Sequence, residues 1–218
     1  MIPARVLLAD PPWEYNDRRE FRLDNPEDKA KFGIGAAGRY EMGCMSTDEL
    51  CDMVHLVREV TTRDSYLLLW ATCPRFPDCI RVGEAWGFEY KTKLFSWVKT
   101  TPGGKLVHNP GRYSHSNTED VLLFRRRGST CWHPSTGYRP HQVVMEPRPT
   151  ADGKPIHSAK PEAVQDRLDT WLDPYIGGAP KIELFARRRR PGWVCMGGDI
   201  SGNDIRYDLA LLARLIRG

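Results

Sequence analysis

The chain lacks the sequence features of membrane-bound, zinc-binding and disulfide-stabilised proteins. Its six cysteines form no CxxC pair and no His/Cys cluster with zinc spacing, so we expect no metal site and free thiols. No apolar stretch reaches membrane length, and the opening MIPARVLLADPP is interrupted too early for a signal peptide. The sequence also holds no internal repeat or low-complexity region. These absences predict a protein of the reducing cytoplasm.

The composition that remains suits one folded domain. The chain has 218 residues, of which 40% are hydrophobic, and this is enough for a sizeable core. The formal net charge of +4 is compatible with a nucleic-acid partner, although most chains with this balance are simply soluble. Composition and charge alone therefore do not define a function.

Buried strands and amphipathic helices alternate along the chain. Several of the strands are apolar on both faces, which favours an α/β fold with a mostly parallel sheet and helices on both faces. Ligands of such sheets bind outside the carboxyl ends of the strands. The predicted strands cover 4–9, 65–72, 91–100, 119–128, 180–187 and a short segment at 142–148. The predicted helices cover 47–60, a segment that ends near Gly87, and 160–175.

Two segments stand apart from this pattern. Residues 14–44 are polar, charged and glycine-rich, and we expect a mobile substrate loop within a domain that covers 1–200. The remainder, 201–218, is predicted to be an amphipathic C-terminal tail with apolar residues at 205, 209, 212 and 216. Packing of this tail on the body of the molecule is favoured over packing on a partner.

The tetrapeptide Asp10-Pro11-Pro12-Trp13 follows the first strand. Two prolines cannot extend a central strand, because each removes a hydrogen-bond donor. The Asp10 carboxylate and the Pro11 carbonyl accept hydrogen bonds, and Trp13 offers a flat face for stacking. This combination suits a planar heterocycle with an exocyclic amine, such as adenine or cytosine. From these residues alone, a turn around a buried tryptophan is an equally good interpretation.

Further motifs extend over residues 6 to 200. Together with DPPW, they resemble the MT-A-seventy family of adenine N-6 methyltransferases, in the layout of its standalone bacterial and phage members. The matching segments are YEMGCMSTDEL, YLLLWAT, GFEYKTKLFSWVKT, SHSNTEDVLLFRRRG, HSAKPEAVQDRL and KIELFARRRRPGW.

The resemblance implies a Rossmann-like, S-adenosylmethionine-dependent methyltransferase in which the catalytic motif precedes the cofactor strand. KIELFAR would occupy the place of that strand, which explains why no GxGxxG motif is present. The implied reaction is methyl transfer to the N-6 amino group of adenine. No metal and no covalent intermediate is needed.

The resemblance also implies roles for individual residues. Lys160 would pair with the methionine carboxylate of the cofactor, and Glu183 would accept from a ribose hydroxyl or the cofactor amine. The segment Gly197-Gly198-Asp199 departs from the Gly-Asn-Glu/Gln of the family and lacks the amide that contacts a ribose. The implied catalytic residues are Asp10, Pro11, Pro12 and Trp13; the substrate-binding residues are Tyr40, Trp70, Lys99 and Asn117; and the cofactor-binding residues are Asp10, Lys160, Glu183, Phe185, Arg187, Gly198 and Asp199.

Basic segments suggest a nucleic-acid partner. In the run 187–190 we expect Arg187 to point inward and the other arginines toward phosphate or solvent. Residues 125–127, Lys99, Lys105 and Arg112 would add to a basic rim. DNA is the favoured substrate. RNA, and a catalytically silent nucleic-acid-binding subunit, are the alternatives, and a dimer or a partner subunit is left open.

Overall fold

A seven-stranded sheet forms the centre of the molecule, in the strand order β5-β3-β4-β2-β1-β8-β9. The computed structural model describes residues 2–14, 44–109, 113–129, 137–156 and 158–218. The strands are β1 (Ala4–Ala9), β2 (Thr61–Ala71), β3 (Phe88–Thr100), β4 (Thr118–Arg126), β5 (Val143–Pro147), β8 (Lys181–Leu184) and β9 (Trp193–Met196). A small antiparallel pair, β6 (Thr150–Ala151) and β7 (Lys154–Pro155), lies outside this sheet.

The sheet is mostly parallel, as predicted. β1 pairs in parallel with β2 and with β8, β8 with β9, and β3 with β5. Only β4 runs against its neighbours in this sheet, β2 and β3. The start of β4 therefore lies at the edge where β1, β2 and β8 end, which brings residues after Asn117 to the predicted site.

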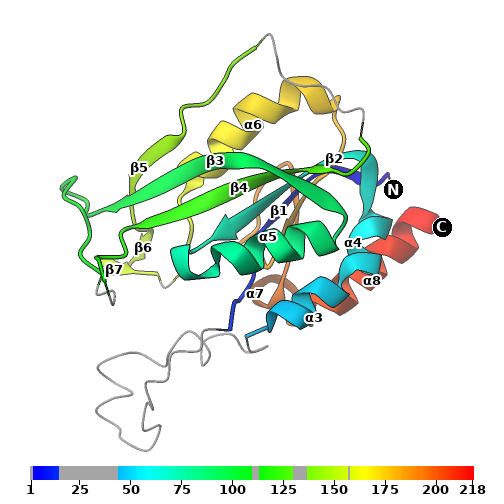
Figure 1. Cartoon of the computed structure of the whole chain (residues 1–218), viewed down its shortest axis with the longest axis horizontal. Helices are drawn as coiled ribbons and strands as arrows, with labels where there is room; N and C mark the ends of the chain where they lie inside the picture. Colours follow the sequence, from blue (N-terminus) through cyan, green and yellow to red (C-terminus); the bar gives the residue numbers. More distant parts are fainter. Residues whose placement is uncertain (1, 15–43, 110–112, 130–136, 157) are drawn as a thin grey trace, which may run out of the picture.

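Helices cover both faces of the sheet, which confirms the predicted layers (Figure 1). α6 (Glu162–Ile176) packs on one face of the sheet, the face to which Val6 and Leu8 of β1 point. The alternate residues Leu7 and Ala9 face the other layer. That layer consists of α3 (Thr47–Asp52), α4 (Val54–Val60), α5 (Phe76–Ala85) and α8 (Ile205–Arg217). Two short helical segments complete the fold, η1 (Cys73–Arg75) and α7 (Gly198–Ser201).

Several predicted boundaries were wrong for local reasons. The helix expected over 47–60 is two helices that meet at Met53, although Ser46 and Glu49 form the predicted capping box. The last predicted strand ends at Leu184 instead of 187, because Phe185 adopts a left-handed backbone conformation with φ 60°. β9 was not predicted, since its four residues stand between an arginine run and a glycine pair.

The predicted intramolecular packing of the C-terminal helix is confirmed. Ile205, Leu209 and Leu212 of α8 are buried in the core, and α8 contacts α4 and β9. The division into a domain over 1–200 and a tail over 201–218 stays a prediction, and nearly all of the loop 14–44 lies outside the described residues. Within the described ranges, no helix combines the length and the apolar character needed to cross a membrane.

Candidate active site

The Asp-Pro-Pro-Trp segment forms a tight turn fixed to the start of α3. The Trp13 N–H donates to the Pro11 carbonyl at 2.9 Å, and the Met45 N–H donates to the Pro12 carbonyl at 2.8 Å. Trp13 is only 5% exposed, and its indole Nε1 has no hydrogen-bond partner among the described residues. The Pro11 carbonyl thus already accepts one hydrogen bond, and its second lone pair remains for a ligand.

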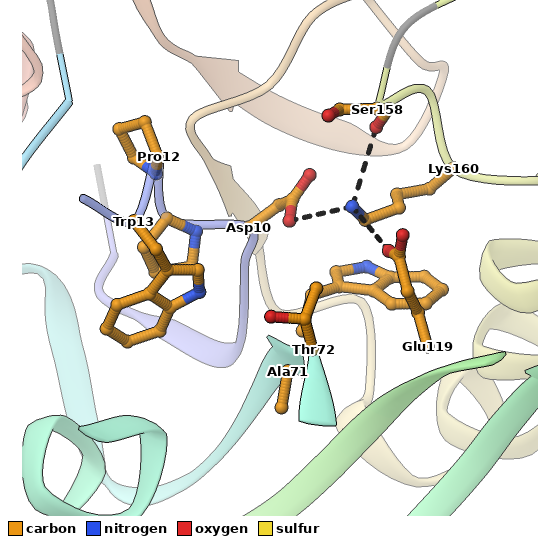
Figure 2. Close-up of a pocket in the computed structure, with 10 residues that line it drawn as sticks. Asp10, Pro12, Trp13, Ala71, Thr72, Glu119, Ser158 and Lys160 are labelled. Carbon is orange, nitrogen blue, oxygen red and sulfur yellow. Dashed lines mark hydrogen bonds and ion pairs between the residues drawn. The ribbon is translucent and has the colours of Figure 1, made fainter. Parts of the chain in front are cut away.

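A pocket opens beside this turn, and we call it the Trp13 pocket (Figure 2). It encloses about 430 Å³ including its open mouth. The Trp70 ring lies in its wall, 5.2 Å below the Lys160 ammonium and edge-on to Trp97 at 6.3 Å. The pocket is lined by Asp10, Pro11, Pro12, Trp13, Trp70, Ala71, Thr72, Glu119, Ser158 and Lys160.

Four buried charges form a continuous chain at the base of this pocket. The Lys160 Nζ lies 3.0 Å from Asp10 Oδ1 and 2.8 Å from Glu119 Oε2, and both ion pairs are drawn in Figure 2. The Lys99 Nζ lies 2.5 Å from Glu119 Oε1. Two carboxylates and two ammonium groups balance one another, so burial leaves no uncompensated charge. We call Asp10, Lys160, Glu119 and Lys99 the ionic quartet.

The quartet controls the protonation of its members. Burial raises the pKa of Asp10, and Lys160 opposes that rise. Burial would also raise the pKa of Glu119, but Lys160 and Lys99 outweigh it and lower that pKa to about 2. Burial would lower the pKa of Lys160, but Asp10 and Glu119 outweigh it and hold the ammonium protonated. Glu119 is therefore a fixed negative charge, whereas the pKa of Asp10 lies above its ordinary value.

A second pocket lies on the other side of Asp10, and we call it the Glu183 pocket. It encloses about 620 Å³ including its mouth. Glu183 is on β8, directly beside Leu8 of β1 in the parallel register, which explains why it lies next to Asp10. The lining residues are Asp10, Pro149, Ile156, Ser158, Ala159, Lys160, Gln165, Glu183, Phe185, Arg187 and Arg188.

A buried amide orients Glu183. Gln165 of α6 is 4% exposed, and its Nε2 donates to Glu183 Oε2 at 2.8 Å. The Gln165 Oε1 accepts from Arg188 at 3.0 Å, so both ends of the amide are used. Burial raises the pKa of Glu183, and the hydrogen bond from Gln165 opposes that rise. The bond leaves Glu183 Oε1 to accept from a ligand in the pocket.

A strained turn follows β8 and shapes the same pocket. Phe185 has a positive φ, an uncommon conformation for a bulky side chain, and it places the residue in the pocket wall. Behind this turn, a Cβ added to Gly197 (φ +154°) would lie 2.8 Å from the Ala186 carbonyl oxygen and 2.9 Å from its nitrogen. Glycine at 197 lets β9 approach the turn this closely.

The structure brings most of the predicted site residues together. Asp10, Pro11, Pro12, Trp13, Trp70 and Lys160 line the first pocket, and Asp10, Lys160, Glu183, Phe185 and Arg187 line the second. Gly198 and Asp199 start α7 beyond β9 and line neither pocket. Asn117 lies just before β4, where its carbonyl accepts from the Lys99 N–H at 2.8 Å. Tyr40 lies outside the described residues.

Two predictions about the basic residues need correction. Lys99 does not extend an open basic rim, because its side chain is 12% exposed and is paired with Glu119. Arg190 does not point toward phosphate or solvent; it binds Asp166 at 2.6 Å and Asp169 at 2.8 Å on α6. In both cases carboxylates of the neighbouring element neutralise the cation. Residues 125–127 do not join the predicted rim either, because they lie at the opposite end of β4 from Glu119, and Arg112 lies outside the described residues.

The sequence interpretation missed Glu119 and Gln165. Glu119 was treated as the first residue of an ordinary strand, and its role depends on the reversed direction of β4. Gln165 stands among the polar residues of an amphipathic helix, where glutamine is common. A weak signal for Gln165 was its position beside Val164, on the flank of the apolar face at 164, 168 and 172.

The two pockets fit a reaction between two ligands that meet at Asp10. The Glu183 pocket offers a carboxylate for hydroxyl or amino donors, cations for a carboxylate, and the apolar surfaces of Phe185, Ile156 and Pro149. This donor set suits S-adenosylmethionine, which carries a ribose, an adenine, an ammonium and a carboxylate. The fold and the two pockets are those expected of a cofactor-dependent methyltransferase.

Comparison with known proteins gives the family. The family model of MT-A70, the family named from the motifs above, matches residues 4–199, and the chain belongs to this family of methyltransferases, which use S-adenosylmethionine. The chain is 35% identical to the type II methyltransferase M.MunI of Mycoplasma sp over 92% of its own length and 79% of that protein.

A fly protein extends the comparison. The chain is 26% identical to the N(6)-adenosine-methyltransferase MT-A70-like protein of Drosophila melanogaster. This similarity covers 90% of the chain but only 27% of the fly protein.

Proposed function

We propose that this chain transfers a methyl group from S-adenosylmethionine to the N-6 amino group of adenine in DNA. The observation that carries the proposal is the position of Asp10 in the wall common to both pockets. A carboxylate in this position can hold an acceptor base in one pocket while it faces a methyl donor in the other. Most of the rate enhancement then comes from positioning.

The Glu183 pocket would hold the cofactor, which supplies a methyl group on a positively charged sulfur. Glu183 Oε1 would accept from a ribose hydroxyl or the amino group, since Gln165 occupies Oε2. Phe185 would provide an apolar contact for the adenine ring. Lys160 or Arg187 would face the methionine carboxylate, and the Lys160 ammonium is already held by Asp10 and Glu119.

The Trp13 pocket would hold the target adenine. The amino group of adenine is a weak nucleophile, because its lone pair is delocalised into the ring. The Asp10 carboxylate and the free lone pair of the Pro11 carbonyl would each accept a hydrogen bond from one of its two N–H groups and aim the nitrogen at the methyl group. These acceptors also stabilise the positive charge that develops on nitrogen. In a duplex, the base must first leave the stack, at a cost of a few kcal/mol.

Lys160 would keep Asp10 competent for this task. Burial alone favours the neutral carboxylic acid, which could accept only weakly. The ammonium at 3.0 Å counters that effect, and Glu119 holds the ammonium in place from its other side. Glu119 would therefore act as a positioning residue for Lys160.

Similarity to a type II methyltransferase over most of this chain favours DNA over RNA. An RNA substrate is the second candidate, because the chemistry at the amino group is the same. A silent binding subunit is disfavoured by the intact Asp10-Pro11-Pro12-Trp13 turn. We also propose a cytoplasmic location. Light scattering on the intact chain would decide whether it forms a dimer, and the methylation assay below tests whether it needs a partner subunit.

The test uses purified protein, tritiated S-adenosylmethionine and matched pools of single-stranded DNA, duplex DNA and RNA. We expect label in N-6-methyl-deoxyadenosine. Asp10→Asn should lower the rate by about 10²–10³-fold, the usual cost of one electrostatic contact to a transition state. Asp48→Ala, on the exposed surface, is the control and should retain activity.

The outcomes separate the candidates. Label confined to the ribonucleoside would move the substrate to RNA. Cofactor binding without label in any pool would indicate a silent subunit or a missing partner. An Asp10→Asn variant that folds normally and keeps full activity would refute the mechanism.

A further inference from the structure

A cluster of arginines lies at the edge of the sheet opposite the active site. It lines a pocket of about 1060 Å³, including its wide mouth, formed by Arg58, Arg63, Glu84, Gly87, Arg126, Arg127 and Gly128. Arg63 is near the start of β2, whose last residue, Ala71, lines the Trp13 pocket. At about 3.3 Å per residue, the two ends are roughly 25 Å apart. We call this site the arginine pocket.

Two of its guanidinium groups converge over a glycine. A Cβ placed on Gly87 would lie 3.4 Å from Arg58 Nη2 and 3.9 Å from Arg126 Cζ. Gly87 has φ +89°, and its carbonyl accepts the Arg127 N–H at 3.0 Å. The backbone thus brings arginines from α4 and β4 to one point, in a conformation that a residue with a side chain rarely adopts.

The positive charges in this pocket lack matching carboxylates. Among the described residues, none of Arg58, Arg63, Arg126 and Arg127 forms an ion pair within 4.0 Å, although Glu84 stands in the pocket wall. By contrast, Lys99 and Lys160 beside the Trp13 pocket each have a carboxylate partner. Like charges held together without a counter-charge repel, unless an anion is bound between them.

Arg126 is held in place in advance of any ligand. Its Nη1 donates to the Trp86 carbonyl at 3.2 Å, and its guanidinium lies over the Phe88 ring at 5.0 Å. Burial lowers the pKa of Arg126, and the charge of Arg58 lowers it further. A fixed guanidinium loses little side-chain freedom when an anion binds, and this favours affinity.

We propose that the arginine pocket binds phosphate groups, in a site separate from the methyl-transfer site. The forked guanidinium groups of Arg58 and Arg126 match the oxygens of a phosphate, and Arg63 and Arg127 add charge at the rim. The phosphate can come from a nucleic-acid backbone or from a free polyphosphate. This inference is independent of the proposed function.

The first experiment measures binding of inorganic pyrophosphate to the whole chain by titration calorimetry. We expect the wild type to bind, and Arg58→Gln/Arg127→Gln to weaken binding at least tenfold, as the loss of charge-assisted hydrogen bonds predicts. Both residues are exposed, so the variant should fold, and thermal unfolding checks this. Arg81→Gln/Arg214→Gln removes the same charge elsewhere and should stay within twofold of the wild type.

Three results would overturn the proposal. These are no pyrophosphate binding by the wild type, equal affinity of the wild type and the pocket variant, or equal weakening in the control variant. Arg126→Lys gives an independent test, because it keeps the charge but removes the fork, and it should also weaken binding.

The source of the phosphate is decided with a duplex DNA of about 40 base pairs. If the backbone is the ligand, the pocket variant should bind the duplex more weakly than the control variant. The slope of log affinity against log salt concentration should also be smaller, by the amount that about two phosphate contacts contribute. If a free polyphosphate is the ligand, duplex affinity should be equal in both variants while pyrophosphate binding differs. Either pattern supports the site.

Discussion

Glu119→Gln tests the ionic quartet most directly. The pKa of Glu119 is held at about 2, against an ordinary value of 4.5, by two ammonium groups at 2.8 and 2.5 Å. A shift of this size corresponds to about 3 kcal/mol of stability at neutral pH. The variant also leaves Lys160 and Lys99 with Asp10 as their remaining counter-charge in the quartet, which adds to the loss. We therefore expect at least about 3 kcal/mol of destabilisation at pH 7.

The pH dependence has a definite sign. The folded pKa of Glu119 is below the unfolded one, so its contribution is complete above the unfolded pKa and is lost as the pH falls toward 2. The difference in the free energy of unfolding between the wild type and Glu119→Gln should fall to roughly half of its pH 7 value by pH 3. Denaturant unfolding of both proteins from pH 7 to pH 3 measures this difference.

Glu162→Gln is the matched control. Glu162 also pairs with two arginines, Arg188 and Arg190, but its side chain is 55% exposed. Its loss should cost less than about 1 kcal/mol, as is usual for exposed ion pairs. Equal destabilisation by the two substitutions, or a difference at Glu119 that does not change with pH, would refute the argument.

Three further predictions follow from packing and hydrogen bonding. Gln165→Ala should weaken S-adenosylmethionine binding about tenfold in calorimetry, because the pocket carboxylate loses a fixed partner; unchanged affinity would count against this role. Leu209→Ala should lower the free energy of unfolding in denaturant by about 2–5 kcal/mol, and Leu211→Ala, at an exposed position of the same helix, by less than about 1 kcal/mol. Equal losses would contradict the packing of α8 seen here. Gly197→Ala should lower the melting temperature more than Gly202→Ala, because only the Cβ added at 197 meets backbone atoms. The reverse order would contradict the close approach of β9 to the turn after β8.

Periodicity and motifs predicted the sheet, its layers and most of its elements. The apolar runs at 4–9 and 65–72 lie in adjacent parallel strands, and the face at 164, 168 and 172 packs on the sheet. Boundaries failed where a single backbone conformation decided them, as at Met53 and Phe185. A local sequence pattern carries little information on such conformations.

In the candidate site too, some residues were predictable from local sequence motifs and others depend on contacts that only the fold creates. Residues inside a motif, such as Asp10, Lys160 and Glu183, line the two pockets. Glu119 and Gln165 gain their importance from contacts across the sheet and across a helix. Partners that are far apart in sequence cannot be paired from one chain without a structure. The roles of the site residues in binding stay predictions.

Lys160 lines both pockets, and this couples the affinities of the two pockets for their ligands. Its single ammonium is held by Asp10 and Glu119, and it borders the space for either ligand. A ligand that changes the partners of this ammonium in one pocket changes the charge presented to the other. Under the proposed function, the affinities for cofactor and target base would be linked by one free energy, and each ligand would alter the affinity for the other by the same factor.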